Sequence, residues 1–130
     1  CYVSTEVNCP GAIIFRMSAF EDAHAEILGS SNYPYNVCCR SATDTISNSC
    51  PGDATPLHLS ANTDAHVEKN TQSNFNANVC LGASAGTVSC SYKANCDASE
   101  TCLATISADT DAHVADCVTQ PFATKICCKI

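Results

Sequence analysis

Three Asp-Ala-His triplets are the residues of this chain whose types and spacing could bind a ligand. They stand at Asp22–His24, Asp64–His66 and Asp111–His113. Histidine is a common ligand of transition metals, and an Asp and a His two positions apart on an extended strand point to the same side. The triplets therefore offer six candidate metal ligands, namely Asp22, His24, Asp64, His66, Asp111 and His113.

Two other interpretations compete with a transition-metal site. Asn62–Asp64 and Asp109–Asp111 could offer oxygen ligands to calcium, but Glu21 precedes the Asp of the first triplet and weakens that idea. The simpler interpretation is structural: each Asp accepts hydrogen bonds from turn amides, and each His packs its ring against the turn. We favour this structural role, with metal binding as the alternative and no resident cofactor expected.

Nucleophilic catalysis would need one Ser or Cys that differs from its counterparts and lies beside a base. Ser18, Ser60 and Ser107 hold equivalent positions before the three triplets, so none of them is distinguished. The chain also has no glycine-rich phosphate loop. We therefore expect a protein that is not an enzyme.

The triplets belong to a longer motif that is written three times, in repeats that span residues 9–39, 50–81 and 96–128. In each repeat a Ser-Ala pair begins four residues before the Asp, and a cysteine follows the His by 14 residues. An aromatic residue stands five positions before that cysteine. Such register indicates one supersecondary unit that is built three times around a shared core.

Within each repeat, apolar and polar residues alternate on both sides of the triplet. Phe15 and Met17 flank Arg16 before the first triplet, for example. Alternation with a period of two predicts strands with one buried face, and Ser-Ala-x-x-Asp-Ala-His is expected to form the turn between them. A helix over Ser18–Gly29 is disfavoured, because the other repeats hold Thr and Val at the equivalent positions.

Three two-stranded units and an N-terminal strand within residues 1–8 (Tyr2–Val7) predict a single all-β domain over residues 1–130. With about seven strands, the best-fitting architecture is a small antiparallel β-sandwich, immunoglobulin-like in outline and stapled by disulfides. A threefold barrel-like arrangement is the alternative. The stretches Ser41–Thr55 and Gly82–Thr101 are expected to be long loops, with a short strand near Thr87–Cys90.

Twelve cysteines in 130 residues are typical of a disulfide-stapled protein from an oxidising, extracytoplasmic compartment. A zinc–thiolate site would need closely spaced C-x-x-C or C-x-x-H pairs, which this chain does not have. We expect every cysteine to be in a disulfide: Cys1, Cys9, Cys38, Cys39, Cys50, Cys80, Cys90, Cys96, Cys102, Cys117, Cys127 and Cys128.

The repeat positions suggest how these cysteines pair. Three disulfides would each clasp one repeat and a fourth would cross the third turn: Cys9–Cys38, Cys50–Cys80, Cys96–Cys127 and Cys102–Cys117. Cys39 and Cys128 fall on the core face of their strands, where the second repeat has Leu81. A Cys39–Cys128 bridge across the core is therefore expected, and Cys1 and Cys90 remain without an assigned partner.

The charge of the chain argues against nucleic acid as a partner. There are 13 acidic and 6 basic side chains, which give a formal net charge of −7. Nucleic-acid-binding proteins instead carry clustered Lys and Arg. The longest unbroken run of aliphatic or aromatic residues is Ala12–Phe15, so we also expect no transmembrane segment.

The repeat resembles a unit of surface-exposed proteins from uncultured bacteria and archaea. In that unit a Ser-x-x-x-(Asn/Asp)-Ala-His core precedes a Tyr and a Val-Cys pair. Ser18–Cys39, Ser60–Cys80 and Ser107–Cys128 carry the pattern, and the second repeat departs from it at Leu81. The resemblance implies an extracellular or cell-surface location and little about activity.

Two functional hypotheses follow from these observations. The first is a non-enzymatic structural subunit of an extracellular filament or pilus-like surface appendage, motivated by the density of cysteines and the tandem β repeats. Such a subunit would form a homopolymer head-to-tail, with the segment Cys1–Cys9 of one copy completing the sheet of the next. The alternative is a secreted, disulfide-rich module that binds a surface glycan, a metal ion or a protein receptor.

Overall fold

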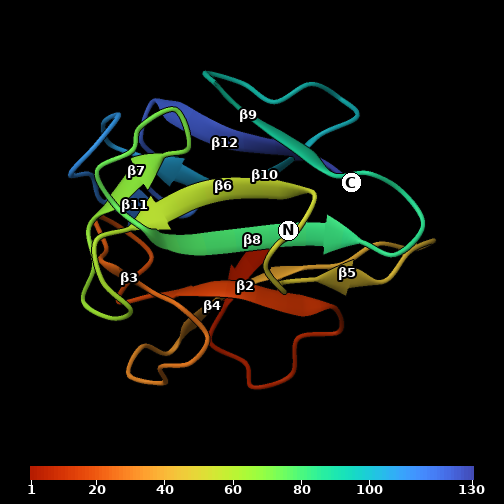
Figure 1. The fold of residues 1–130 in the computed structure, drawn as a ribbon, viewed down its shortest axis with the longest axis horizontal. Helices are drawn as coiled ribbons and strands as arrows, with labels where there is room; N and C mark the ends of the chain where they lie inside the picture. The colour runs from red at the N-terminus through yellow and green to blue at the C-terminus, as the bar shows by residue number, and fades with distance from the viewer.

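A computed structural model describes residues 1–130 and shows an all-β chain without helices. It therefore has no helix with the length and apolar character of a membrane span. Its twelve strands are labelled in Figure 1: β1 (Tyr2–Ser4), β2 (Ala12–Met17), β3 (Ala25–Glu26), β4 (Tyr35–Cys39), β5 (Ile46–Ser47), β6 (Ala54–Leu59), β7 (Val67–Lys69), β8 (Ala77–Ala83), β9 (Ser89–Lys93), β10 (Thr101–Ile106), β11 (Val114–Ala115) and β12 (Thr124–Lys129).

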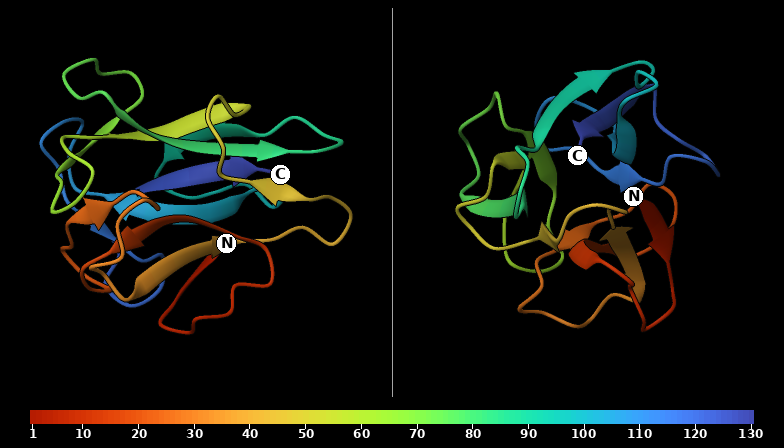
Figure 2. Two further views of the ribbon diagram at one scale, coloured as in Figure 1. Left: turned by 60° about the horizontal axis from the view of Figure 1, so that its bottom comes forward. Right: turned by 90° about the vertical axis from the view of Figure 1, so that its right-hand side faces the viewer.

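The strands form three small antiparallel sheets of four strands each. The strand order is β1-β4-β2-β3 in the first sheet, β5-β8-β6-β7 in the second and β9-β12-β10-β11 in the third, so the same order recurs. Viewed along its long axis, the molecule has its three sheets around a common centre (Figure 2, right). The expected seven strands are too few, because a short edge strand lies on either side of each central pair.

The antiparallel, all-β class predicted from the alternation is confirmed, but an immunoglobulin-like sandwich is not. A sandwich distributes its strands over two facing sheets. Here every sheet is built from four consecutive strands, and there are three of them. The physical reason is that each repeat pairs locally, and its single narrow apolar face is then covered by the two neighbouring sheets.

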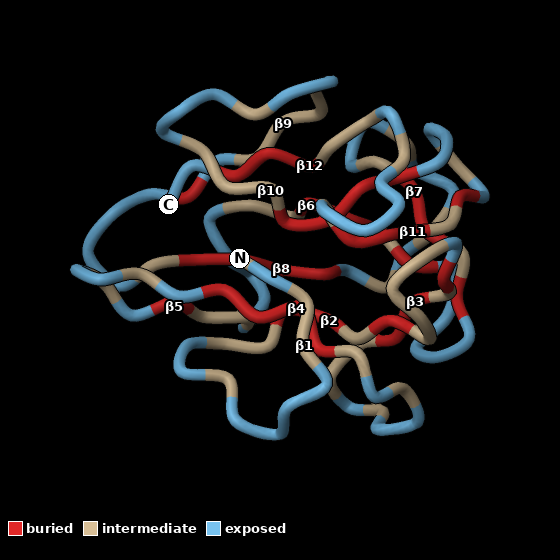
Figure 3. The backbone as a smooth tube through the Cα atoms, turned by 180° about the vertical axis from the view of Figure 1, so that it is seen from behind, coloured by how far each residue is buried: buried red, intermediate tan, exposed pale blue.

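One cluster of 22 buried residues fills the space between the sheets (Figure 3). The central strands supply the alternating apolar side chains that the sequence pattern indicates. Phe15, Met17, Leu57 and Leu59 are completely buried, and so is Ile126 at the position that Val37 holds in the first repeat. Burial of these side chains from all three repeats makes the fold a single hydrophobic unit.

No cysteine is free. The structure contains the four pairs that the repeat positions suggest: Cys9–Cys38, Cys50–Cys80, Cys96–Cys127 and Cys102–Cys117. The first three of these join the start of a repeat to its last long strand.

The predicted Cys39–Cys128 bridge is wrong. Cys39 is bonded to Cys1, and Cys128 is bonded to Cys90. The edge strands explain this, because β1 pairs with β4 and β9 pairs with β12, so each core-facing cysteine has a cysteine of its own sheet beside it. In the second sheet the equivalent edge strand is β5, which contains no cysteine. A cysteine at position 81 would therefore have no partner, and the chain has Leu81 there.

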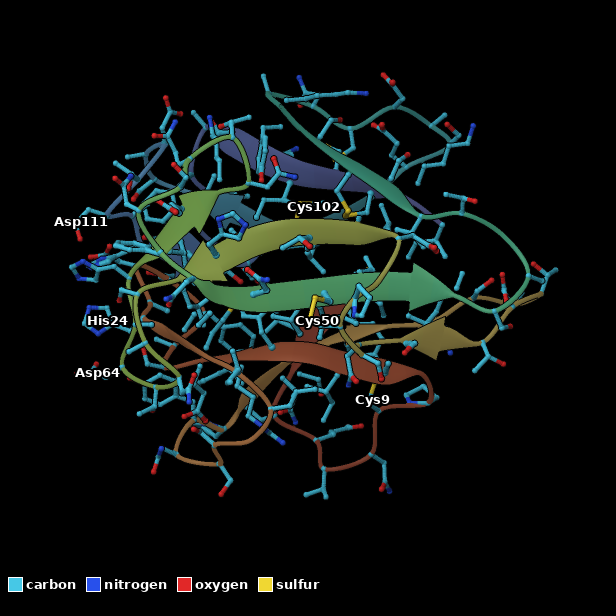
Figure 4. The ribbon with its side chains drawn as sticks, viewed as in Figure 1. Cys9, His24, Cys50, Asp64, Cys102 and Asp111 are labelled. Carbon is cyan, nitrogen blue, oxygen red and sulfur yellow. A yellow bond between two sulfur atoms is a disulfide. The ribbon has the colours of Figure 1, made fainter.

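The N-terminal strand lies within its own domain. It pairs with β4, where Val3 stands opposite Val37, and it ends at Ser4 rather than at the predicted Val7. The two termini lie close together (Figure 2), and the amino group of Cys1 donates a hydrogen bond of 2.8 Å to the Thr101 hydroxyl. One end of the molecule carries the Asp-Ala-His turns (Figure 4).

We predict that the loss of one disulfide destabilises the second repeat more than the first. Cys50–Cys80 is the only disulfide of the second repeat, and its removal should cost about 3–4 kcal/mol of unfolding free energy in the chain-entropy model. Cys9–Cys38 spans a similar 29 residues but lies inside the loop closed by Cys1–Cys39. Its removal should therefore release less chain entropy in the unfolded state.

Denaturant unfolding of a Cys50→Ala/Cys80→Ala variant and a Cys9→Ala/Cys38→Ala variant measures this difference. Equal losses of unfolding free energy in the two variants would contradict the prediction.

Candidate metal centre

Each Asp-Ala-His triplet lies in a turn that is closed by the Ser six positions before its His. In the first repeat the Ser18 amide donates to the His24 carbonyl at 3.0 Å, and the His24 amide donates to the Ser18 hydroxyl at 3.1 Å. The same two bonds close the turns Ser60–His66 and Ser107–His113. The structure thus contains the turn that the sequence predicts, with the Ser in the expected role.

The Asp of each triplet adopts the left-handed backbone conformation. Its φ angle is 43° at Asp22, 47° at Asp64 and 47° at Asp111, and no other non-glycine residue has a positive φ. Asp tolerates this region better than most residues, because its short polar side chain can hydrogen-bond locally. The alanine that follows is buried in all three repeats, while the histidine after it stays partly exposed.

Backbone hydrogen bonds join the three turns into a closed ring. Three isolated bridges link the repeats: Ala23 with Val114, Ala65 with Ala25, and Ala112 with Val67. Each bridge consists of two N–H···O=C bonds with lengths from 2.7 to 3.0 Å. Because every repeat is bonded to both of the others, the turns meet around one axis.

This ring gathers the three histidines at one end of the molecule, where Figure 4 labels His24. The ring centroids of His24, His66 and His113 lie 4.8–4.9 Å apart in all three pairs. Their side chains are 30–36% exposed, so solvent reaches one side of the cluster. The three candidate histidines therefore form one site.

Each histidine is bonded to the aspartate of a neighbouring repeat and not to that of its own triplet. His24 Nδ1 lies 2.6 Å from Asp64 Oδ1, and His113 Nδ1 lies 2.6 Å from Asp22 Oδ1. His66 is bonded to Asp111 in the same way. The sequence suggested both the Asp and the His residues as metal ligands. In the structure each aspartate is instead bonded to the Nδ1 atom of a neighbouring histidine and orients its imidazole.

These bonds determine which ring nitrogen carries the hydrogen. An ionised carboxylate only accepts hydrogen bonds, so each Nδ1 must be the donor, and a neutral ring then has a bare lone pair on Nε2. The bond from His24 also lowers the pKa of Asp64, which keeps this carboxylate ionised. The Nε2 atoms of His66 and His113 lie 3.3 Å apart, and one nitrogen of each of the three rings lies within 4.8 Å of the others.

One nitrogen from each of the three rings could therefore act as a ligand of a single cation. Zinc–nitrogen bonds of about 2.05 Å at the tetrahedral angle place two ligand nitrogens about 3.3 Å apart, which matches His66 and His113. Nitrogen ligands suit a transition metal better than calcium, which takes oxygen ligands. A carboxylate behind each ring is the usual arrangement at such centres.

A second group of potential ligands, Cys96, Glu100 and Cys127, lies at the other end of the third sheet. Its two sulfur atoms form the Cys96–Cys127 disulfide, so they cannot act as thiolate ligands. The Glu100 carboxylate is bonded to Lys93 at 2.8 Å. This group is therefore a structural contact.

Two buried glutamates lie beneath the ring of turns, and the sequence did not identify them as part of this region. Glu26 and Glu68 each follow a triplet histidine by two residues and are completely buried. Glu26 accepts hydrogen bonds from the Tyr33 amide at 2.7 Å and from the Thr63 hydroxyl of the next repeat at 2.8 Å. Burial alone would raise the pKa of Glu26, but the hydrogen bonds from Tyr33, Thr63 and a neighbouring Asn outweigh it and lower the pKa.

Glu68 makes the equivalent bonds to the Phe75 amide and to the Thr110 hydroxyl of the third repeat. The sequence signal for this link is a Glu two positions after the His, together with a Thr before the next Asp. The third repeat has Ala115 at the Glu position, and there the buried Thr105 hydroxyl accepts the Phe122 amide at 2.9 Å instead.

Tyr33 makes one of the three His–Asp pairs different from the others. Its hydroxyl donates to Asp64 Oδ1 at 2.9 Å, whereas Phe75 and Phe122 hold the equivalent positions in the other repeats. Burial and the adjacent Asp64 raise the pKa of Tyr33. Tyr33 is half-buried and lies at the rim of the histidine cluster.

Comparison with known proteins adds no assignment: no family model, no curated protein and no solved structure matches this chain.

We predict that stability depends more on the left-handed backbone conformation at position 64 than on the negative charge of Asp64. Asp64→Asn keeps both an acceptor for the ring N–H and a side chain that tolerates a φ of 47°, so stability should change by no more than about 0.5 kcal/mol. Asp64→Val places a β-branched residue in this conformation and should cost about 1–3 kcal/mol.

Thermal unfolding of the two variants without added metal measures this difference. Equal destabilisation by Asn and Val would show that the carboxylate charge, and not the left-handed backbone, is what the turn requires.

Proposed function

We propose that this protein is a secreted, disulfide-stapled module that binds one divalent transition-metal ion, with Zn²⁺ as the reference ion, through His24, His66 and His113. The observation that carries the proposal is that one nitrogen of each of the three rings lies within 4.8 Å of the others, while the Nδ1 atom of each ring is bonded to a carboxylate of a neighbouring repeat. A secreted module that binds a metal ion is one form of the alternative hypothesis that the sequence suggests.

The geometry favours an ion that accepts tetrahedral coordination. Three equivalent ligands around one axis occupy three corners of a tetrahedron, which suits Zn²⁺ or Co²⁺. A square-planar arrangement, which Cu²⁺ favours, would need ligands on opposite sides of the ion. The threefold ring does not offer that arrangement.

The site is also formed in advance of binding. The histidines are held by the closed ring of backbone bonds, by the aspartates and by a core with six disulfides. Little side-chain freedom then remains to be lost when an ion binds, which favours affinity.

Imidazole ligands fit the compartment that the disulfides indicate. Six disulfides with no free cysteine are typical of an oxidising, extracytoplasmic environment. Thiolate ligands would be lost to oxidation there, whereas imidazole keeps its lone pair. A metal site built from histidine alone is therefore consistent with the proposed extracellular or cell-surface location.

The filament subunit stays a prediction. In the structure β1 pairs with β4 of its own domain, and Cys1 is bonded to Cys39. Strand exchange between subunits would need both of these contacts to form between copies. Electron microscopy of concentrated protein, with and without metal, tests whether the chain polymerises by this or another route.

We predict that Zn²⁺ stabilises the protein and that each of the three histidines is required. At a free zinc concentration of 100 times Kd, the ion should add about 2.7 kcal/mol to the unfolding free energy. His24→Ala, His66→Ala and His113→Ala should each weaken zinc binding by about 100-fold or more, because each removes one of three ligands rather than a supporting group.

Isothermal titration calorimetry and thermal unfolding with and without zinc measure these effects. His58→Ala is the matched control, because His58 lies on β6 and is paired with Glu68, outside the cluster. Zinc binding that survives the loss of any triplet histidine, or that is lost equally in His58→Ala, would refute the proposed site.

We further predict that Tyr33→Phe changes zinc affinity by no more than about threefold, well below the 10–100-fold typical of supporting groups. The chain itself provides the comparison, because Phe75 and Phe122 already occupy the equivalent places beside the other two His–Asp pairs. Calorimetry of the variant is the measurement. A loss above tenfold would mean that the Tyr33 hydroxyl, and not the carboxylate alone, positions the His24 ring.

A further inference from the structure

An ion at the three histidines would have protein on one side only. The ring of turns lies at one end of the molecule (Figure 4), and the alanines of the triplets close its inner side with exposed fractions of 0–1%. The histidine side chains are 30–36% exposed on the other side. Because three ligands arranged around an axis leave the fourth tetrahedral corner on that axis, this corner points outward into solvent.

The charges around this corner are negative. Asp22, Asp64 and Asp111 are each bonded to one ring of the cluster, so a divalent ion with these three carboxylates carries a net charge of 2 − 3 = −1. The buried Glu26 and Glu68 lie two residues from two of the ligands and add negative charge beneath.

The Lys69 side chain, three residues after His66, is already paired. Lys69 is bonded to Asp109 at 2.6 Å and neutralises a carboxylate outside the His–Asp ring. A small anion would therefore approach the ion against a negative field, whereas a neutral donor would not.

We propose, on the basis of the metal site above, that the bound ion keeps an exchangeable outward coordination position that takes a neutral nitrogen ligand of the imidazole class in preference to an anion. Water occupies this position in the absence of such a ligand. Imidazole is a good fourth ligand for ions already bound by three histidines, since it has the same donor chemistry.

The imidazole must come from another kind of molecule. The chain has four histidines, of which three are the ligands. The fourth, His58, has a side chain only 18% exposed and faces Glu68. A second copy of this chain therefore has no free imidazole to offer, and the ligand is either a small imidazole compound or a histidine side chain of a different protein.

The test uses the intact disulfide-bonded protein loaded with Co²⁺, whose visible absorption reports the coordination geometry. Imidazole and azide are titrated separately, and their dissociation constants are obtained from the change in the Co²⁺ bands. We expect imidazole to bind at least about tenfold more tightly than azide.

The matched variant is Asp22→Asn/Asp64→Asn/Asp111→Asn, which keeps an acceptor for each ring N–H and a residue suited to positive φ, but removes three charges. Its preference for imidazole over azide should fall by about tenfold, because three charges at this range contribute that much even with strong solvent screening. An unchanged preference would overturn the electrostatic argument.

The outcomes separate this inference from the metal site itself. Absence of Co²⁺ bands that depend on the three histidines would refute the metal site. Co²⁺ bands that do not respond to imidazole, or that respond more strongly to azide, would refute the exchangeable imidazole position and leave the metal site standing.

A histidine-containing tripeptide, titrated in parallel, distinguishes the two sources of the ligand. Binding as tight as that of free imidazole supports a protein side chain as the natural ligand. Much weaker binding supports a small imidazole compound.

Discussion

A closed ring of backbone hydrogen bonds between three turns is the constraint on which the site depends. Each bond contributes only about 1 kcal/mol net, and each turn by itself would be a surface loop. In the ring, however, every turn is held by both neighbours, so no turn moves without breaking two bridges. The histidines take their 4.8–4.9 Å spacing from this ring, and the His–Asp bonds across the same boundaries then set the direction of each imidazole.

The three boundaries between repeats are alike at the surface and differ beneath it. Glu26 and Glu68 tie the first two boundaries through buried hydrogen bonds, at the cost of removing a carboxylate from water. The third boundary has Ala115 at the Glu position and keeps only the backbone bond that all three boundaries share, in which the Ile27, Lys69 and Asp116 amides donate to the carbonyls of Asn62, Asp109 and Phe20 at 2.8–2.9 Å. The adjacent Cys102–Cys117 disulfide restrains this segment. The ring thus keeps its geometry although its supports differ.

What could be predicted from the sequence was local. The Ser–His turn, the buried face of each central strand and the disulfide that clasps each repeat all connect residues of one repeat, so repeat spacing was enough to identify them. The partner of Cys39, the bond from His24 to Asp64 and the role of Glu26 depend on which strand or repeat lies alongside. Alternation tells which face of a strand is buried but not what covers it, so three sheets around one centre were not distinguished from a two-sheet sandwich.

The structural role favoured by the sequence is confirmed for the Ser, which closes the turn through two bonds. It is wrong for the Asp, which was expected to accept turn amides: its backbone has a positive φ, and its carboxylate is bonded to the imidazole of a neighbouring repeat. The histidine is different. Its Nδ1 holds the ring in place, and one nitrogen of each ring lies within 4.8 Å of the others in a partly exposed cluster. The hydrogen bonds that close each turn join the Ser to the backbone of the His, so the turn itself does not require an imidazole side chain. The proposed metal binding would use these nitrogens, and it would need one histidine from each of the three repeats.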